Sequence, residues 1–392
     1  MINRYILISL ASIFWLLCIL VLSSKGRNLI VNSFGLNSSK GNYIKGFDGL
    51  RGIAALWVSI FHLFIWPIPS TNPLKLDINL LGSKAVPIFI ALSGFLIIKS
   101  FKRNLELNNN FKEALKHFLH NRFIRVYPLY FFTTLIHLCT FFYYLNTKNL
   151  LTFEVIKNNF IGEIFMLKII GWTGMVNPVS WSLYVEVIFY FLVPFIIIYA
   201  GKRLFFYSII IFVFFSSIDF SISREMALWE YFAIGIIAEE LFSKKLINKL
   251  ISILISVIGL LILFLDIYLQ FNKDLNYANA TPPEFTFLLS LGIFLLLISI
   301  PNSFPIYKFL ELLPLKFLGK ISYSLYLTHS LFIISIFNLS FDGKGHFFTL
   351  HKNQEFYGLW SIIILLIPSM ISCSSISYLI FEKPFLRFRS NI

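Results

Sequence analysis

Charged side chains are scarce in this chain of 392 residues, because Asp, Glu, Lys and Arg together make up only 13% of it. An average soluble domain contains about 25% of these residues, and a water-soluble protein of this size could not cover its surface with so few. Hydrophobic residues make up 57% of the chain and aromatic residues 18%, which excludes an intrinsically disordered chain. The composition therefore predicts an integral membrane protein.

Cysteine is also scarce, and the usual signatures of metal, nucleotide and nucleic-acid binding are missing. Cys18, Cys139 and Cys373 lie in apolar runs, so we expect no disulfide, and no Cys/His cluster has the spacing of metal ligands. The chain has no Walker-type phosphate loop and no nucleic-acid motif. We therefore expect no bound metal and no nucleic-acid partner, although the net charge is +14.

Long apolar runs are abundant. A helix that crosses a bilayer needs about 20 mostly apolar residues, and the sequence holds about eleven such runs. They are Tyr5–Leu22, Phe47–Trp66, Ser83–Phe101, Val126–Leu145, Ser180–Ala200, Leu204–Phe220, Met226–Phe242, Leu250–Phe271, Phe285–Ile300, Ile321–Leu339 and Tyr357–Phe381. The stretch Leu151–Trp172 is apolar but carries charges, so we expect an interfacial or re-entrant segment there.

Lys and Arg are distributed unevenly between the loops that join these runs. When the loops are numbered from the first run, the odd loops hold more than twice as many Lys and Arg as the even loops. Because cytoplasmic loops carry the excess of basic residues, the odd loops and the C-terminus are predicted to be cytoplasmic. Residues 1–46 then form an N-terminal spanning helix with a basic cytoplasmic loop, and residues 47–392 form the main membrane domain.

Ionisable residues inside spanning helices are costly and indicate functional sites. Arg51 and His62 are eleven positions apart in one run, so they share a helix face and lie about 16 Å apart along the axis. An Arg offers a cationic fork for phosphate, and a His offers a base or nucleophile near neutral pH. The pair predicts a site for an elongated anionic ligand, although an anchoring Arg and an interfacial His would look the same.

Glu186 lies inside the run that begins near Ser180, about 9 Å below the expected outer surface. His62 lies at a similar expected depth, about 6 Å from the outer end of its own helix. We therefore expect the Glu186 carboxylate to pair with the His62 imidazole and to orient it. A carboxylate solvated by an external vestibule is the alternative.

Three further features allow a structural and a functional interpretation. Arg122 and Arg125 share one helix face at a cytoplasmic end, where they would anchor the helix or bind phosphate. His329 lies near mid-membrane in a polar seam, as a structural or a substrate-lining residue. Ser93 and Gly94 put small residues in mid-helix, which favours close helix packing.

Six sequence segments, in this order, resemble the membrane-bound acyltransferase-3 family of bacterial glycan O-acyltransferases. The resemblance covers nearly the whole chain, from about Phe47 to Phe385, and implies a ten-helix body to which the first run adds one helix. The segments are FDGLRGIAALWVSIFHLF, FIALSGFLI, RFIRVYP, WSLYVEVIFYFLVPF, GKISYSLYLTHS and FEKPF.

The resemblance implies an O-acyltransferase that moves an acyl group, usually acetyl, from cytoplasmic acyl-coenzyme A to a sugar hydroxyl. The acceptor would be a cell-envelope polysaccharide or a lipid-linked glycan precursor, and the protein would lie in the bacterial cytoplasmic (inner) membrane among its lipids. The implied residues fall into three groups. They are His62 and Glu186 for catalysis, Arg51, Arg122 and Arg125 for acyl-CoA, and Ser93, Trp181, Tyr326 and His329 for lining the substrate site.

Other classes of membrane protein fit the composition less well. A transporter or flippase of lipid-linked sugars is the main alternative, but it predicts internal repeats and paired discontinuous helices that the sequence does not display. A glycan polymerase would more naturally carry a large external loop. A purely structural membrane protein would have no need of Arg51, His62 and Glu186 within its spans.

Overall fold

The structure is a computed structural model that describes residues 4–36, 43–66, 82, 84–108, 110–167, 176–216, 224–245, 247–271, 287–337 and 362–388. Over these residues it is built from helices and contains no strand, which confirms the predicted all-α fold. The longer helices are α1 (Arg4–Leu22), α2 (Ser24–Phe34), α3 (Phe47–Ile65), α5 (Ala85–Leu107), α6 (Phe111–Thr147), α7 (Phe153–Ile164), α8 (Trp181–Ala200), α9 (Leu204–Ser216), α11 (Trp229–Ser243), α12 (Lys249–Phe271), α13 (Phe287–Ser299), α16 (Ser322–Phe337) and α18 (Ile367–Ser377).

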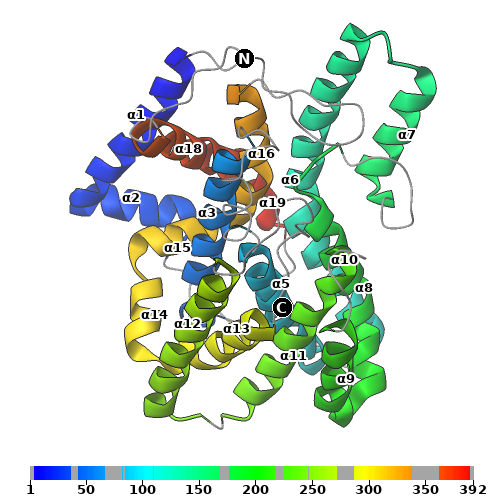
Figure 1. Cartoon of the computed structure of the whole chain (residues 1–392), viewed down its shortest axis with the longest axis vertical. Coiled ribbons are helices and arrows are strands. Elements are labelled where there is room, and N and C mark those ends of the chain that lie inside the picture. Colours follow the sequence, from blue (N-terminus) through cyan, green and yellow to red (C-terminus); the bar gives the residue numbers. More distant parts are fainter. Residues whose placement is uncertain are drawn as a thin grey trace.

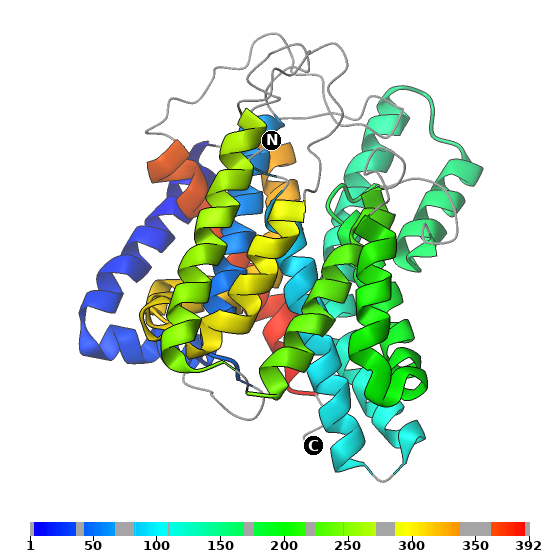
Figure 2. The same cartoon turned by 60° about the horizontal axis from the view of Figure 1, so that its bottom comes forward.

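Short helices and turns connect or extend these elements. They are η2 (Gly201–Arg203), α10 (Arg224–Ala227), η4 (Ile300–Asn302), α14 (Phe304–Leu310), α15 (Leu313–Lys320), η5 (Ile362–Leu366), η6 (Tyr378–Glu382) and α19 (Lys383–Leu386). Together η5, α18, η6 and α19 make one helical run over Ile362–Leu386. Figure 2 shows α3, α5, α12 and α13 running roughly along one axis, as expected for a membrane bundle.

Six helices of the described part are long and apolar enough to cross a membrane, or up to eight if each sharply bent pair counts as one span. This number is lower than the predicted eleven because several predicted runs form shorter helices. The helix α16 has 16 residues, α11 has 15 and α9 has 13. Parts of the predicted runs lie outside the described residues, namely Ser83, 217–220, 285–286, 338–339 and 357–361, as does 168–172 of the predicted interfacial segment.

The N-terminal region differs from the predicted helix and loop. After α1 the chain turns by 118° into α2, which begins at the capping Ser23 and ends at Gly35 in the left-handed conformation. α1 packs against α18, where the Ser369 hydroxyl donates to the Leu7 carbonyl. Figure 1 shows α1 and α2 at the edge of the bundle beside α18 and α15. The helix α2 was not predicted, because a segment of only 11 residues between Ser23 and Gly35 resembles a polar loop in the sequence.

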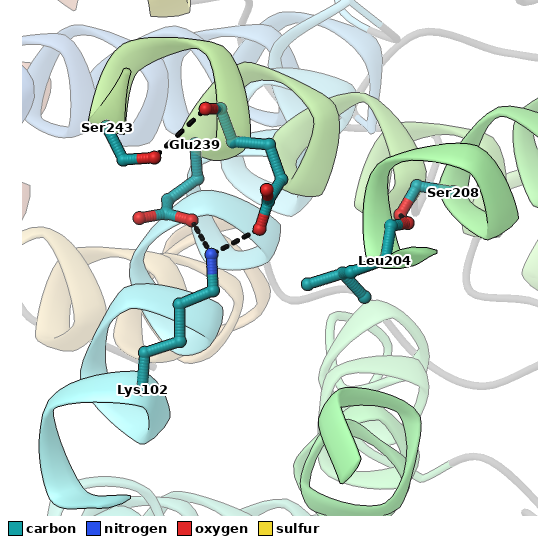
Figure 3. Close-up of polar contacts among 6 residues, drawn as sticks. Lys102, Leu204, Ser208, Glu239 and Ser243 are labelled. Carbon is teal, nitrogen blue, oxygen red and sulfur yellow. Dashed lines mark hydrogen bonds and ion pairs between the residues drawn. The ribbon is translucent and has the colours of Figure 1, made fainter. Parts of the chain in front are cut away.

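The helices α5 and α11 form the most extensive helix pair, and glycines bring them together. A Cβ atom on Gly235 would lie 2.2 Å from the Ala91 carbonyl oxygen, and one on Gly94 would lie 2.6 Å from that of Phe232. This close approach confirms the packing role expected for Gly94. At one end of the pair Lys102 reaches from α5 to α11, where its ammonium lies 2.5 Å from Glu239 and also contacts Glu240 (Figure 3).

The helix α6 is much longer than the predicted Val126–Leu145 run. It extends over 37 residues and starts at the capping Asn110, so Arg122 and Arg125 lie within it rather than at its end. Pro128 is accommodated inside the helix. Figure 1 shows the far end of α6 together with α7 at one side of the molecule, and α7 occupies part of the predicted interfacial stretch.

Candidate active site

The candidate site residues form two polar layers inside the bundle. The histidine pair, His62 on α3 and His329 on α16, makes the first layer. The arginine cluster, Arg51 on α3 with Arg122 and Arg125 on α6, makes the second. Because Arg51 and His62 share α3, the layers are about 16 Å apart along its axis.

The two imidazoles of the histidine pair are joined by one hydrogen bond. His62 Nδ1 lies 2.8 Å from His329 Nε2, and the rings are parallel to within 6° with centroids 5.0 Å apart. His329 is fully buried, and its Nδ1 lies 3.1 Å from the carbonyl oxygen of Leu325 one turn earlier.

These contacts select the tautomer of both rings. A carbonyl oxygen can only accept, so His329 Nδ1 carries the proton and, in the neutral ring, His329 Nε2 accepts. His62 Nδ1 must then be the donor of the bond between the rings. The remaining nitrogen of His62, Nε2, keeps its lone pair and has the form that a general base requires.

Aromatic side chains surround the histidine pair. The Trp66 ring centroid lies 4.6 Å from that of His62 and 6.1 Å from that of His329, and it is tilted by only 35° and 29° from the two rings. Phe61 and Tyr326 lie 4.9 Å and 6.0 Å from the nearest imidazole centroid. The pair therefore lies in a site of low polarity, where hydrogen bonds are stronger than in water.

Two residues predicted to line the substrate site lie at the junction of α8 and α16. The Tyr326 hydroxyl lies 2.6 Å from Ser182 Oγ and donates to the Val179 carbonyl oxygen at 2.9 Å. Trp181, the first residue of α8, is half-buried beside Ser182. Tyr326 therefore ties the start of α8 to the helix that carries His329, so a structural task accompanies the predicted lining role.

The arginine cluster gathers three cations in the interior. Arg122, Arg125 and Glu186 all lie within electrostatic range of Arg51, as does Asp48 one turn earlier on α3. Three arginines face two carboxylates, which leaves a positive excess. Such a site suits a ligand that carries several negative charges, because Arg binds phosphate with a planar fork of donors.

Arg122 is held by aromatic rings. Its guanidinium lies over the rings of Phe118 and Tyr190, 5.4 Å and 5.6 Å from their centroids. A pocket of about 360 Å³ opens beside it between α6 and α8, with Phe123 and Phe191 in its wall. The aromatic rings therefore fix the orientation of the guanidinium.

Glu186 belongs to the arginine cluster and not to the histidine pair. Its Oε1 accepts from the Ser93 hydroxyl at 3.0 Å and from the Tyr190 hydroxyl at 2.5 Å. The expected Glu186–His62 pairing is therefore wrong in this structure, where His329 takes the place of the carboxylate. Ser93 likewise lies with Glu186 and not beside the histidine pair.

The depth estimate failed because α8 lies lower in the bundle than its sequence limits suggested. Ser182 is level with Tyr326, which is three residues before His329, so the start of α8 already lies on the arginine side of the histidine pair. Glu186 comes one turn later, a further ~6 Å toward the arginines.

Lysine and tyrosine side chains pack together near the start of α3. The Lys45 ammonium lies 4.9 Å from the Tyr307 ring centroid, and Lys316 lies 5.4 Å from that of Tyr43. The Tyr43 hydroxyl donates to Glu311 at 3.0 Å. Burial, followed by the negative charge of Glu311, raises the pKa of Tyr43 well above its usual value, so this hydroxyl stays a donor.

Several polar residues are buried in the structure although the sequence did not predict their burial. His137 on α6 is fully buried, with its Nδ1 2.8 Å from the Thr133 carbonyl oxygen and its Nε2 3.1 Å from the Ser330 hydroxyl. Glu163 was counted as an interfacial charge, but it is fully buried and accepts from the Val176 amide at 2.5 Å and from the Tyr184 hydroxyl at 2.8 Å. An ionisable residue within an apolar run was the available signal for His137.

A buried ion pair was also missed. Lys84, which follows the first residue of the predicted run Ser83–Phe101, is 2% exposed and lies 3.0 Å from Asp266 on α12, which is 1% exposed. The Lys84 ammonium also donates to Gln270 at 2.9 Å. Asp266 is the acidic residue of an otherwise apolar helix, and this feature of the sequence signals a buried cationic partner.

Comparison with known proteins adds two findings. The model of the acyltransferase-3 family, described as an acyltransferase domain, matches residues 44–379. A protein of Acidianus two-tailed virus named "Putative acetyltransferase ORF330" is 28% identical over 156 residues, which are 40% of this chain and 41% of that protein. The chain thus spans about two fifths of the length of this relative. No solved structure matches the chain.

Proposed function

This chain belongs to the acyltransferase-3 family, and from that premise we propose that it transfers an acetyl group from acetyl-coenzyme A to a sugar hydroxyl of an envelope polysaccharide or lipid-linked glycan. The observation that carries the proposal is the histidine pair. Its hydrogen bonds give His62 the tautomer of a general base, on the helix that also carries Arg51. Aromatic side chains keep this base in a site of low polarity.

The reaction in this proposal is a direct acyl transfer. The acceptor hydroxyl oxygen attacks the thioester carbonyl carbon while its proton moves to His62 Nε2. The carbon–sulfur bond then breaks, and the proton passes from His62 to the departing thiolate. The products are the O-acetyl sugar and free coenzyme A, so atoms and charges balance.

His329 orients His62 during this cycle. When His62 takes the proton it becomes an imidazolium whose Nδ1–H still points at His329 Nε2, and this acceptor stabilises the positive charge. His329 therefore performs the orienting task that a carboxylate performs in many hydrolases and transferases. Glu186 instead holds Ser93 and Tyr190 in the arginine cluster.

The arginine cluster is the proposed site for the coenzyme A phosphates. Its excess of positive charge suits a polyanion, and the Arg51–His62 separation of about 16 Å along α3 suits a long flexible arm that ends in a thioester. In this proposal Arg51, Arg122 and Arg125 bind the phosphates from the cytoplasmic side. The acetyl group then reaches the histidine pair through the bundle, so that the acceptor is modified at the opposite face.

The proposal includes a location and a topology. The chain would cross the bacterial cytoplasmic membrane about eleven times if its shorter helices also span a bilayer of ordinary thickness. The C-terminus would be cytoplasmic, as would the basic loops. Residues 1–46 would form an addition to the membrane domain of residues 47–392.

The test is transfer of radiolabelled acetyl from acetyl-coenzyme A in inside-out membrane vesicles of a bacterial host that expresses the chain. The account expects label in the glycan fraction that requires both the chain and the donor. Label that stays with the donor in vesicles holding folded protein, with several acyl-coenzyme A donors and added glycan precursors, would contradict the proposal. A flippase would instead move a fluorescent lipid-linked sugar across the same vesicles without any acyl donor.

A further inference from the structure

We infer that Trp66 is a positioning residue for the reaction, and that its indole face stabilises the His62 imidazolium that forms when the base takes the acceptor proton. This inference rests on the proposed function. In the sequence Trp66 is only the end of an apolar run, and neither the histidine pair nor the arginine cluster assigns it a task.

The position of the indole carries the inference. Trp66 follows α3 directly, and its backbone amide donates to the His62 carbonyl oxygen at 3.1 Å, so the two side chains are one turn apart on one helix. The indole centroid is 4.6 Å from the His62 centroid and 6.1 Å from the His329 centroid. Because the two imidazoles are nearly parallel, one indole lies across both of them.

This geometry matches a cation–π interaction. The face of an indole carries negative potential and attracts a cation within about 6 Å of the ring centroid, and Trp is the strongest of the aromatic residues in this respect. The attraction grows when water is excluded, and Trp66 is only 9% exposed. The neutral imidazole gains little from the same contact, so the indole favours the protonated state of His62.

Within the part of the chain that the structure describes, few charged groups near His62 compete with this effect. On α16 the titratable neighbours are His329, Tyr326 and Tyr323. On α6, which packs against α16, His137 lies within electrostatic range of His329. On α8 the nearest carboxylate is Glu186, which is held in the arginine cluster. At the N-cap of α5 the Lys84 ammonium is paired with Asp266. The cations of α15 and Arg51 lie toward the other end of α3. Among the described residues, the indole is therefore a principal electrostatic neighbour of the protonated pair.

A graded series of fluorinated tryptophans provides the sharpest experiment. Fluorine withdraws negative potential from the indole face while hardly changing its shape, so a cation–π contact weakens step by step. We expect kcat for acetyl transfer from acetyl-coenzyme A to fall with each added fluorine, while KM for the donor stays constant. The same series in Trp66→Phe protein is the control for the other tryptophans, and there kcat should not respond.

Substitutions give a second, independent readout. In Trp66→Leu we expect kcat to fall about threefold and the acid limb of the kcat–pH profile to move to lower pH by about half a unit. The shift is downward because loss of the indole makes the protonated base less stable. Trp66→Phe should give a smaller change of the same sign. Trp229→Leu, a change of a partly buried indole that packs on Phe189 and Phe232, should leave the acid limb in place.

The outcomes separate this inference from the proposed function. Suppose that wild-type protein transfers acetyl in a His62-dependent way, but kcat is insensitive to fluorination and the acid limb of the kcat–pH profile stays in place in Trp66→Leu. Trp66 then only fills space, and the inference is overturned. If Trp66→Leu fails to fold, the fluorinated wild-type series still decides. If wild-type protein transfers no acetyl group, the proposed function has failed first.

Discussion

Replacing His329 by Leu removes the acceptor that selects the tautomer of His62. The lost bond is 2.8 Å long, and its acceptor ring is fully buried, so water cannot readily replace it. A buried donor without an acceptor costs about 1–3 kcal/mol. His62 avoids this cost by carrying its proton on Nε2, which is the nitrogen that must act as base. We therefore expect kcat to fall by about 5- to 150-fold.

The assay is acetyl transfer from labelled acetyl-coenzyme A into glycan, with kcat and KM for the donor measured separately. KM should hardly change because the arginine cluster is about 16 Å away along α3. His329→Gln, whose amide oxygen can accept from His62 Nδ1, should recover part of the loss. His137→Leu is the matched control, since this buried imidazole contacts Thr133 and Ser330. Equal kcat in His329→Leu and wild type, or a Gln variant no better than Leu, would refute the reasoning.

Three further predictions follow from contacts elsewhere in the bundle. Arg122→Gln should raise KM for acetyl-coenzyme A about tenfold but leave KM for acetyl-pantetheine, which lacks the nucleotide, unchanged; equal effects on both donors would argue against phosphate binding. Lys84→Met or Asp266→Leu alone should destabilise the protein by about 3–5 kcal/mol, and the double variant should regain most of it; thermal unfolding in detergent measures this, and additive losses would contradict it. Gly235→Val should prevent α5–α11 packing, because its Cβ would meet the Ala91 carbonyl at 2.2 Å, and a monodisperse, stable variant would count against that contact.

The helices that were predicted best from the sequence are those whose apolar runs have clear ends. The helix α3 begins at the predicted Phe47 and ends one residue before the predicted Trp66, and α8 ends at the predicted Ala200. Both are bounded by turns and filled with apolar residues, so composition alone locates them. The family predicted from the motifs is confirmed by the match over residues 44–379.

Features that depend on how helices are placed relative to one another were not predictable. The depth of Glu186 was counted from the end of its own helix, but α8 is displaced along the bundle, and only tertiary contacts such as Ser182–Tyr326 reveal this. The Lys84–Asp266 pair joins residues far apart in the chain. The sharp turn between α1 and α2 likewise reflects packing on α18 and α19 rather than any strong local signal.

The partnership of the two histidines illustrates the same limit. Sequence periodicity identified His62 and His329 separately as interior residues, and each was a reasonable functional candidate. Their bond requires α3 and α16 to be neighbours, which periodicity within one helix cannot show. Trp66 became significant only once its indole was seen across both rings.

The central claim is that His62 is the base of an acyl transfer, and comparing His62→Ala with His137→Ala tests it most directly. Both variants remove a histidine from a spanning helix, and both should be matched to wild type for membrane insertion. With labelled acetyl-coenzyme A, the account predicts label in the glycan fraction for wild type and for His137→Ala, and a loss of at least about 100-fold in His62→Ala. Label from His62→Ala at the wild-type rate would contradict the account.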